Sequence, residues 1–260
     1  MELINEKEIS RSIREKLSQI EERENIRIIY ACESGSRAWG FASTDSDYDV
    51  RFIFIRPVQD YLRVQELPDF IDAELNEVYD INGWDLKKFL KQLYKSNPVI
   101  FEWAGSPVVY KTSSEWKQVL ELMKEFVQES SILAHYRGMA KNNVRSNFDT
   151  SEIVLKKYLY VLRPVLACIW IMQKHSVPPT EFGRLVDEVL PQELRYIVDE
   201  LLKAKKNAGE KQKGLRIPEL DLFIEVKLNE AAAVSKNAEQ EKNTQKLNEL
   251  FLSLVNAGTI

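Results

Sequence analysis

The sequence predicts an α+β fold: a small mixed β-sheet with flanking helices over residues 1–112, followed by an all-helical domain over residues 113–260. Two apolar patterns in the first part indicate strands, because residues 26–32 (IRIIYAC) are β-branched and apolar and residues 47–55 alternate between apolar and polar. From about Ser113 onward, the apolar residues recur at helical spacing almost without exception. With 260 residues, of which 44% are hydrophobic, the chain is long enough to bury a core in each part.

The first elements lead into a Gly-Ser turn. Residues 6–20 are expected to form a helix, since their apolar residues fall on one helical face, and residues 26–32 are expected to form a buried strand that runs directly into Glu33. Gly35 then allows the backbone to approach a ligand closely, and Ser36 adds a hydroxyl donor. Arg37 follows, and it either offers a forked cation to a phosphate or pairs with Glu33 or a neighbouring aspartate.

Two aspartates begin the second predicted strand, over residues 47–55. Asp47 and Asp49 are spaced i,i+2, so they leave the same face of the strand with α-carbons about 6.6 Å apart. Their carboxylates can converge on one cation, and Mg²⁺ or Mn²⁺ suits such oxygen ligands. A solvated strand end would carry the same pair, but the apolar opposite face and the preceding strand with its Gly-Ser turn favour a catalytic site.

A third strand is expected over residues 77–84 (EVYDINGW), with Asp80 as its central acid. Asp85 directly precedes an apolar helical face and is therefore interpreted as the N-cap of the next helix. Asp80 is accordingly preferred over Asp85 as the third acid of the site. Pro98 is expected to open another helix, and the run SPVVY near Val108 to return one more strand.

The second half contains the remaining predicted elements. Helices are expected over residues 116–130, 132–147, 151–174, 182–190 and 191–205, and from residue 218 to before residue 240, with an exposed loop over residues 203–215. Arg137, Lys141 and Arg145 share one helical stripe, and Lys157 and Arg163 form a second basic cluster near two tyrosines. These residues are either nucleotide or acceptor contacts or solvated helix faces.

Composition excludes several classes of protein. No apolar stretch reaches the roughly 20 residues needed to span a bilayer, and the N-terminus has no apolar signal region, so a soluble cytoplasmic protein is expected. The net charge of −4 argues against nonspecific coating of nucleic acid. Cys32 and Cys168 match no disulfide or metal spacing, and neither histidine has a partner at zinc-ligand spacing.

A strand, a Gly-Ser turn, a paired acid on a second strand and an acid on a third together resemble the DNA polymerase beta nucleotidyltransferase superfamily. More closely, GSRAWGFASTDSDYDVRFIF, DINGWDLKKFL, NPVIFEW and KKYLYVLRPVLACIWI resemble the YcgL-like predicted nucleotidyltransferases, a subgroup linked by name to RNA repair. The resemblance extends from Ile26 to about Phe223. It identifies residues 1–112 as a nucleotidyltransferase catalytic domain.

The resemblance implies a role for each motif. Gly35 and Ser36, with Arg37 beside them, would hold a nucleoside triphosphate such as ATP, and the three acids would be catalytic and bind Mg²⁺ or Mn²⁺. The acids are Asp47, Asp49 and Asp80. The implied reaction transfers a nucleoside monophosphate to a hydroxyl by a two-metal mechanism and releases pyrophosphate. The acceptor is open among an RNA end, a small molecule and a protein. The competing interpretation is a catalytically inactive nucleotide-binding or partner-interaction module with the same fold.

Overall fold

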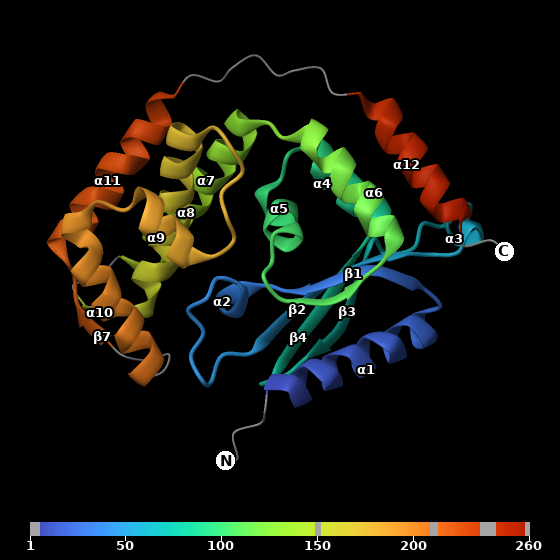
Figure 1. The fold of residues 1–260 in the computed structure, drawn as a ribbon, viewed down its shortest axis with the longest axis horizontal. Coiled ribbons are helices and arrows are strands. Elements are labelled where there is room, and N and C mark those ends of the chain that lie inside the picture. Colours follow the sequence, from blue (N-terminus) through green and yellow to red (C-terminus); the bar gives the residue numbers. More distant parts are fainter. Residues whose placement is uncertain (1–5, 149–151, 209–212, 235–242, 258–260) are drawn as a thin grey trace.

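The computed structural model describes residues 6–148, 152–208, 213–234 and 243–257. Its central feature is a five-stranded mixed sheet with the strand order β3-β4-β2-β1-β5. One helix lies against one face of the sheet, several lie against the other, and a separate group of helices stands beside it (Figure 1). The α+β fold class predicted from the sequence is therefore confirmed.

The three strands predicted around the site residues join in this sheet. They are β1 (Arg27–Glu33), β2 (Tyr48–Ile55) and β4 (Tyr79–Asp85). β2 pairs with β1 in the antiparallel direction and with β4 in the parallel direction. β5 (Val109–Thr112), the strand expected near SPVVY, pairs with β1, and β3 (Phe70–Leu75), which the sequence did not predict, forms the other edge.

Helix α1 (Glu6–Glu24) covers one face of the sheet. Its buried residues are Ile9, Ile13, Leu17 and Ile20, the same four that define its apolar face in the sequence. They share a hydrophobic cluster with Val50, Phe52 and Phe54 of β2. The alternating residues of β2 therefore turn one set of side chains toward α1 and leave the other set on the opposite face.

The opposite face is covered by helices from the middle of the sequence and by one from its last part. They are α4 (Leu86–Tyr94), α5 (Pro98–Ala104), α6 (Ser114–Met123) and α12 (Thr244–Asn256). Ile53 and Ile55 of β2 pack into this cluster, so the face that carries Asp49 near the start of the strand carries apolar side chains further along. Helices beyond residue 112 thus contact the sheet, and the domain boundary at that position stays a prediction.

The longer of the remaining helices build a bundle around α8 (Lys156–Lys174). The others are α7 (Glu129–Asn147), α9 (Phe182–Val189), α10 (Gln192–Ala208) and α11 (Pro218–Ala233). No helix within the described residues has both the length and the apolar character needed to cross a membrane.

Local differences from the predicted elements concern short segments. The helix expected over residues 151–174 begins at Lys156, because residues 152–154 form β6 (Glu152–Val154), which pairs with β7 (Lys213–Leu215). The loop expected over residues 203–215 is in part the end of α10 and in part β7. The helix expected over residues 116–130 ends at Met123 and continues only as a 3₁₀ turn, Lys124–Phe126.

Candidate active site

The acidic side chains predicted to act together lie on adjacent strands. In the parallel pair of β2 and β4, Asp49 stands directly opposite Asp80, and Asp47 is the residue that precedes β2. Cross-strand partners in a sheet have their β-carbons about 5 Å apart, so the backbone ladder itself fixes the spacing of Asp49 and Asp80. The structure thereby brings together two acids that are 31 positions apart in the sequence.

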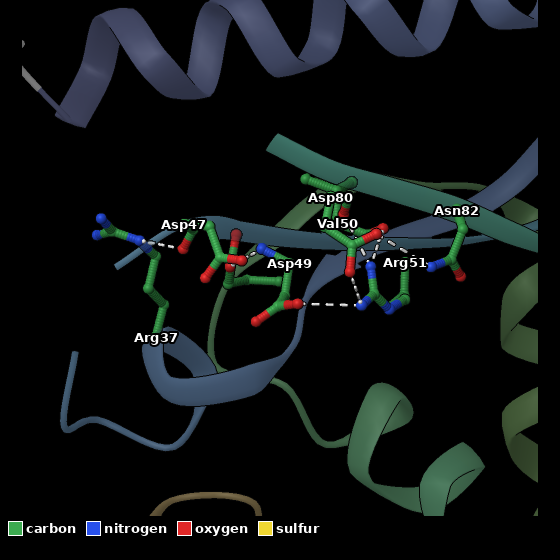
Figure 2. Close-up of polar contacts among 8 residues, drawn as sticks. Arg37, Asp47, Asp49, Val50, Arg51, Asp80 and Asn82 are labelled. Carbon is green, nitrogen blue, oxygen red and sulfur yellow. Dashed lines mark hydrogen bonds and ion pairs between the residues drawn. The ribbon is translucent and has the colours of Figure 1, made fainter. Parts of the chain in front are cut away.

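Arg51 bridges these two carboxylates (Figure 2). Its Nη2 donates to Asp49 Oδ1 at 3.0 Å and to Asp80 Oδ2 at 2.7 Å. Its Nη1 donates to the carbonyl oxygens of Asp80 at 2.8 Å and of Val50 at 3.1 Å. Arg51 follows Asp49 by two positions on β2 and therefore leaves the same face of the strand. Its role was not predicted from the sequence, because the pattern of one strand does not show which strand lies beside it.

The electrostatic surroundings of Asp49 favour a cation. Burial raises the pKa of Asp49 to about 6, Arg51 opposes that rise, and the neighbouring charges of Asp47 and Asp80 add to it. Burial and like charge both disfavour the ionised carboxylate. Holding these acids close together therefore costs electrostatic free energy, and a positive charge between them lowers this cost.

The Gly-Ser motif is attached to the same strand. It forms a short helix, α2 (Gly35–Ala38), where the sequence predicted a turn. The Ser34 amide donates to the carbonyl of Asp49 at 2.7 Å. Gly35 has a φ of +58°, and a β-carbon at this position would lie 1.8 Å from Asp49 Oδ2. Only glycine allows this backbone to lie against the carboxylate, while the Ser36 side chain is buried beside it.

Arg37 contacts the loop before β2. Its Nε donates to the carbonyl of Asp47 at 3.0 Å and its Nη2 to the carbonyl of Ser46 at 2.7 Å. Its guanidinium also stacks on the ring of Tyr48, 3.7 Å from the ring centroid. Arg37 thus bonds to backbone oxygens of this loop, and these contacts fix the chain on which Asp47 stands.

Glu33, the last residue of β1, is a site residue that sequence reasoning missed. Its side chain is buried, accepts a hydrogen bond from the Asp49 amide at 2.8 Å and accepts a second from the Tyr110 hydroxyl. Burial raises the pKa of Glu33 to about 7, although both hydrogen bonds oppose the rise. Its position two residues before Gly35 was the available signal. Glu33, Arg37 and Tyr110 also line a cleft of about 750 Å³ beside α1.

Asp85 has a separate role at the other end of β4. Its Oδ1 accepts from the Lys87 amide at 2.7 Å, which makes it the N-cap of α4, and its Oδ2 accepts from the Tyr61 hydroxyl at 2.8 Å. Asp85 pairs across the sheet with Phe54, five positions along β2 from Asp49. Asp80, and not Asp85, is therefore the acid beside Asp49, and its role as the third acid of the site stays a prediction.

Comparison with known proteins places this arrangement in a family. Residues 9–253 match RlaP, described as the RNA repair pathway DNA polymerase beta family. The chain belongs to the RlaP family. It is also 38% identical to "Uncharacterized protein YcgL" of Bacillus subtilis (strain 168) over 245 residues, which cover 93% of this chain and 94% of that protein. The recognition made from the sequence motifs is confirmed.

The helical residues proposed as contacts lie in three different settings in this RlaP-family chain. Arg163 is buried in α8, where its Nη1 pairs with Glu102 Oε1 at 2.9 Å and its guanidinium lies 4.4 Å from the ring centroid of Trp39. Arg137 on α7 reaches the carbonyl of Ala231 at 3.5 Å. Lys141 is exposed and Lys157 is half-buried. A nucleotide or acceptor contact by any of them stays a prediction.

The three acids of this RlaP-family chain fit a divalent cation by their chemistry. All of their donors are carboxylate oxygens, and Asp49 and Asp80 already share one positively charged group. Within the described ranges, no three acidic, histidine or cysteine side chains are gathered closely enough to form a ready-made metal centre. The donor chemistry of Asp47, Asp49 and Asp80 fits Mg²⁺ or Mn²⁺, Arg51 contacts two of these acids, and a metal site at the three acids stays a prediction.

Proposed function

We propose that this protein transfers a nucleoside monophosphate from a nucleoside triphosphate to an acceptor hydroxyl and releases pyrophosphate. The observation that carries the proposal is the direct pairing of Asp49 with Asp80 on parallel strands, with Gly35 against the Asp49 carboxylate. Membership of a DNA polymerase beta family supports the same reaction class. The paired acids are suited to bind the divalent cation that takes part in phosphoryl transfer, and the Gly-Ser helix is suited to bind the phosphates.

The proposed roles follow from the positions of the residues. Gly35 and Ser36 hold the triphosphate, while Arg37 keeps the loop of Asp47 in place. Asp47, Asp49 and Asp80 hold the divalent cation. When bound, such a cation neutralises charge on the phosphates and lowers the pKa of the attacking hydroxyl. Asp80 is the carboxylate that borders the acceptor and receives or orients its proton.

We propose an RNA end as the acceptor to test first. The description of the family names an RNA repair pathway, which favours RNA over the small molecules and protein side chains that the sequence leaves open. The nucleotide is identified by the same experiment, because each of the four triphosphates can be offered separately. Adenosine triphosphate, the usual cellular donor, belongs in the first comparison.

The test is transfer from α-³²P-labelled triphosphates to short RNAs with free 3′-hydroxyl ends, with Mg²⁺ or Mn²⁺. We expect labelled RNA and one pyrophosphate per transfer, and loss of both with EDTA. Asp49→Asn and Asp80→Asn should lower the rate by about 1000-fold or more, because a neutral amide no longer balances a cation in the transition state. Melting temperatures of each variant separate lost chemistry from lost folding.

Asp85→Asn is the matched control, since it removes an acid from the same strand but keeps an N-cap. It should transfer at close to the wild-type rate. Equal activity in wild type, Asp49→Asn and Asp80→Asn, or transfer that survives EDTA, would show that these acids do not perform the reaction. Nucleotide binding without transfer to any acceptor would support an inactive binding module in place of an enzyme.

A further inference from the structure

The guanidinium of Arg51 occupies the place between the two central acids of the site (Figure 2). We propose that Arg51 is a resident counterion that the divalent cation must displace, and that the phosphates of the incoming nucleotide accept the displaced guanidinium. Metal and nucleotide then bind cooperatively, and each binds weakly alone. This inference rests on the proposed function, because it concerns the same acids and the same substrate.

The contacts of one nitrogen atom make the competition direct. Arg51 Nη2 touches Asp49 Oδ1 at 3.0 Å and Asp80 Oδ2 at 2.7 Å, so it is the positive group that these two carboxylates share. The other oxygen of Asp80 accepts from Asn82 Nδ2 at 3.3 Å. A cation that enters the place between these two oxygens overlaps with Nη2 and is repelled by its charge, so the cation and Arg51 compete for that place.

Partial burial gives this contact its strength. The side chain of Arg51 is 15% exposed, and those of Asp49 and Asp80 are 21% and 27% exposed. Hydrogen bonds between charged partners with little access to water are stronger than bonds on an open surface. Displacing Arg51 therefore has a substantial free-energy cost, which a metal ion alone must overcome.

A nucleotide offsets that cost because it supplies a new partner for the arginine. The planar fork of a guanidinium matches phosphate oxygens in a bidentate way, and Arg51 stands on the strand that borders the Gly-Ser helix. A nucleotide that stabilises the displaced arginine strengthens metal binding by some factor. The metal must then strengthen nucleotide binding by the same factor, because coupling between two ligands is reciprocal. Arg51 is thus a positioning residue. It makes the metal bind more tightly to protein that already holds a nucleotide than to free protein.

The first measurement is Mn²⁺ affinity in the absence of nucleotide, followed by the electron paramagnetic resonance signal of free Mn²⁺ at pH 8. We expect Arg51→Gln to bind Mn²⁺ about tenfold more tightly than the wild type, because two charge-assisted bonds no longer compete. Arg51→Lys should fall between them, since lysine keeps the charge but has no fork. Arg56→Gln removes the same charge just beyond the end of β2, away from Asp49, and should bind like the wild type.

The second measurement repeats the titration with the α,β-methylene analogue of the preferred triphosphate, which cannot be cleaved at the α-phosphate. In the wild type the analogue should tighten Mn²⁺ binding by about tenfold or more, and in Arg51→Gln this coupling should largely disappear.

Unchanged or weaker Mn²⁺ binding in folded Arg51→Gln would overturn the inference, as would coupling equal to that of the wild type. If the wild type still transfers nucleotide when one of these results is found, the inference about Arg51 fails but the proposed function stands. If no variant binds Mn²⁺ with or without nucleotide, that result counts against both the inference and the proposed function. Melting curves confirm folding, and Arg51→Lys carries the test if Arg51→Gln does not fold.

Discussion

Gly35 shows how little freedom a single position in this site has. Its backbone adopts a left-handed conformation, and the nearest side-chain atom to a hypothetical β-carbon is the Asp49 carboxylate oxygen. The same residue therefore sets both the path of the chain into α2 and the distance between that helix and a proposed metal ligand. Five positions further along the chain, Gly40 has a φ of +85°, but a β-carbon added there would meet no atom within 4 Å.

Gly35→Ala and Gly40→Ala form a matched pair that separates strain from collision. Both place alanine in a left-handed conformation, which costs about 1 kcal/mol of folding stability. Only Gly35→Ala must also push the Asp49 carboxylate aside, and we expect it to lower nucleotide transfer by about 100-fold, because displacements near 1 Å in an active site have effects of this size. Melting temperatures and steady-state rates check both effects.

Gly40→Ala should melt at a lower temperature while keeping most of its transfer rate. Equal activity losses in the two variants would mean that the contact between Gly35 and Asp49 has no special importance.

At the scale of elements, Asp85 links the end of β4 to the start of α4. It is almost fully buried, and burial raises the pKa of its carboxyl above the usual value, while the Lys87 amide and Tyr61 hydroxyl oppose the rise. Between the usual and the raised pKa, the folded protein holds a proton that the unfolded chain has lost. The free energy of unfolding contributed by Asp85 therefore falls as pH increases through this interval and is constant above it.

Asp85→Asn should therefore become more stable relative to the wild type as pH rises from about 3 to 7, because asparagine keeps the cap and has no proton to lose. Asp85→Ala should be less stable than Asp85→Asn by about 1 kcal/mol at every pH, since alanine cannot accept from the Lys87 amide. Urea denaturation at several pH values measures both differences. If the stability difference between Asp85→Asn and the wild type does not vary with pH, the pKa of Asp85 is not raised by folding.

The elements that carry local patterns were predicted well from the sequence, and the contacts between them were not. The alternation of β2 and the apolar face of α1 are properties of one segment, so the paired acids and the helical cover could be inferred from spacing. The bridge from Arg51 to Asp80 depends on which strand lies beside β2, and a single strand pattern does not contain that information. The buried ion pair of Arg163 with Glu102 was not predicted for the same reason, because Glu102 is 61 positions away in the sequence.

Short edge elements were the other limit. β3, with the sequence FIDAEL, is partly exposed and has no clear alternation, so it gave no strand signal. β6 and β7 have three residues each and exist because they pair with each other. Asp49 and Asp80, in contrast, each stand on a strand with a clear pattern, and only the structure shows that these two strands are neighbours.

At the scale of the whole molecule, helix α12 follows the bundle in the sequence and returns to the sheet. Leu254 is buried in the cluster that covers the sheet, its carbonyl accepts from Arg27 Nη2 at 3.0 Å, and Phe251 packs edge-on against Tyr61. The site-bearing sheet is thus covered by helices from both ends of the sequence (Figure 1).

Leu254→Ala should lower the free energy of unfolding by about 3 kcal/mol, since it leaves a cavity in a closed cluster. Leu252→Ala, two positions away and 58% exposed, should change it by about 0.5 kcal/mol or less. Chemical denaturation followed by tryptophan fluorescence measures both, because Trp116 lies in the cluster beneath α12. Similar losses in the two variants would indicate that α12 does not pack as described.

The return of α12 also has a consequence for how the protein is made. A ribosome releases the chain from its N-terminus, so α1 and all five strands of the sheet are synthesised before residues 244–256. Until those residues emerge, the apolar face formed by Ile55 and its neighbours lacks the helix that completes its cover. The newly made sheet therefore exposes apolar surface of the kind that chaperones bind, until α12 has been synthesised and packs against it.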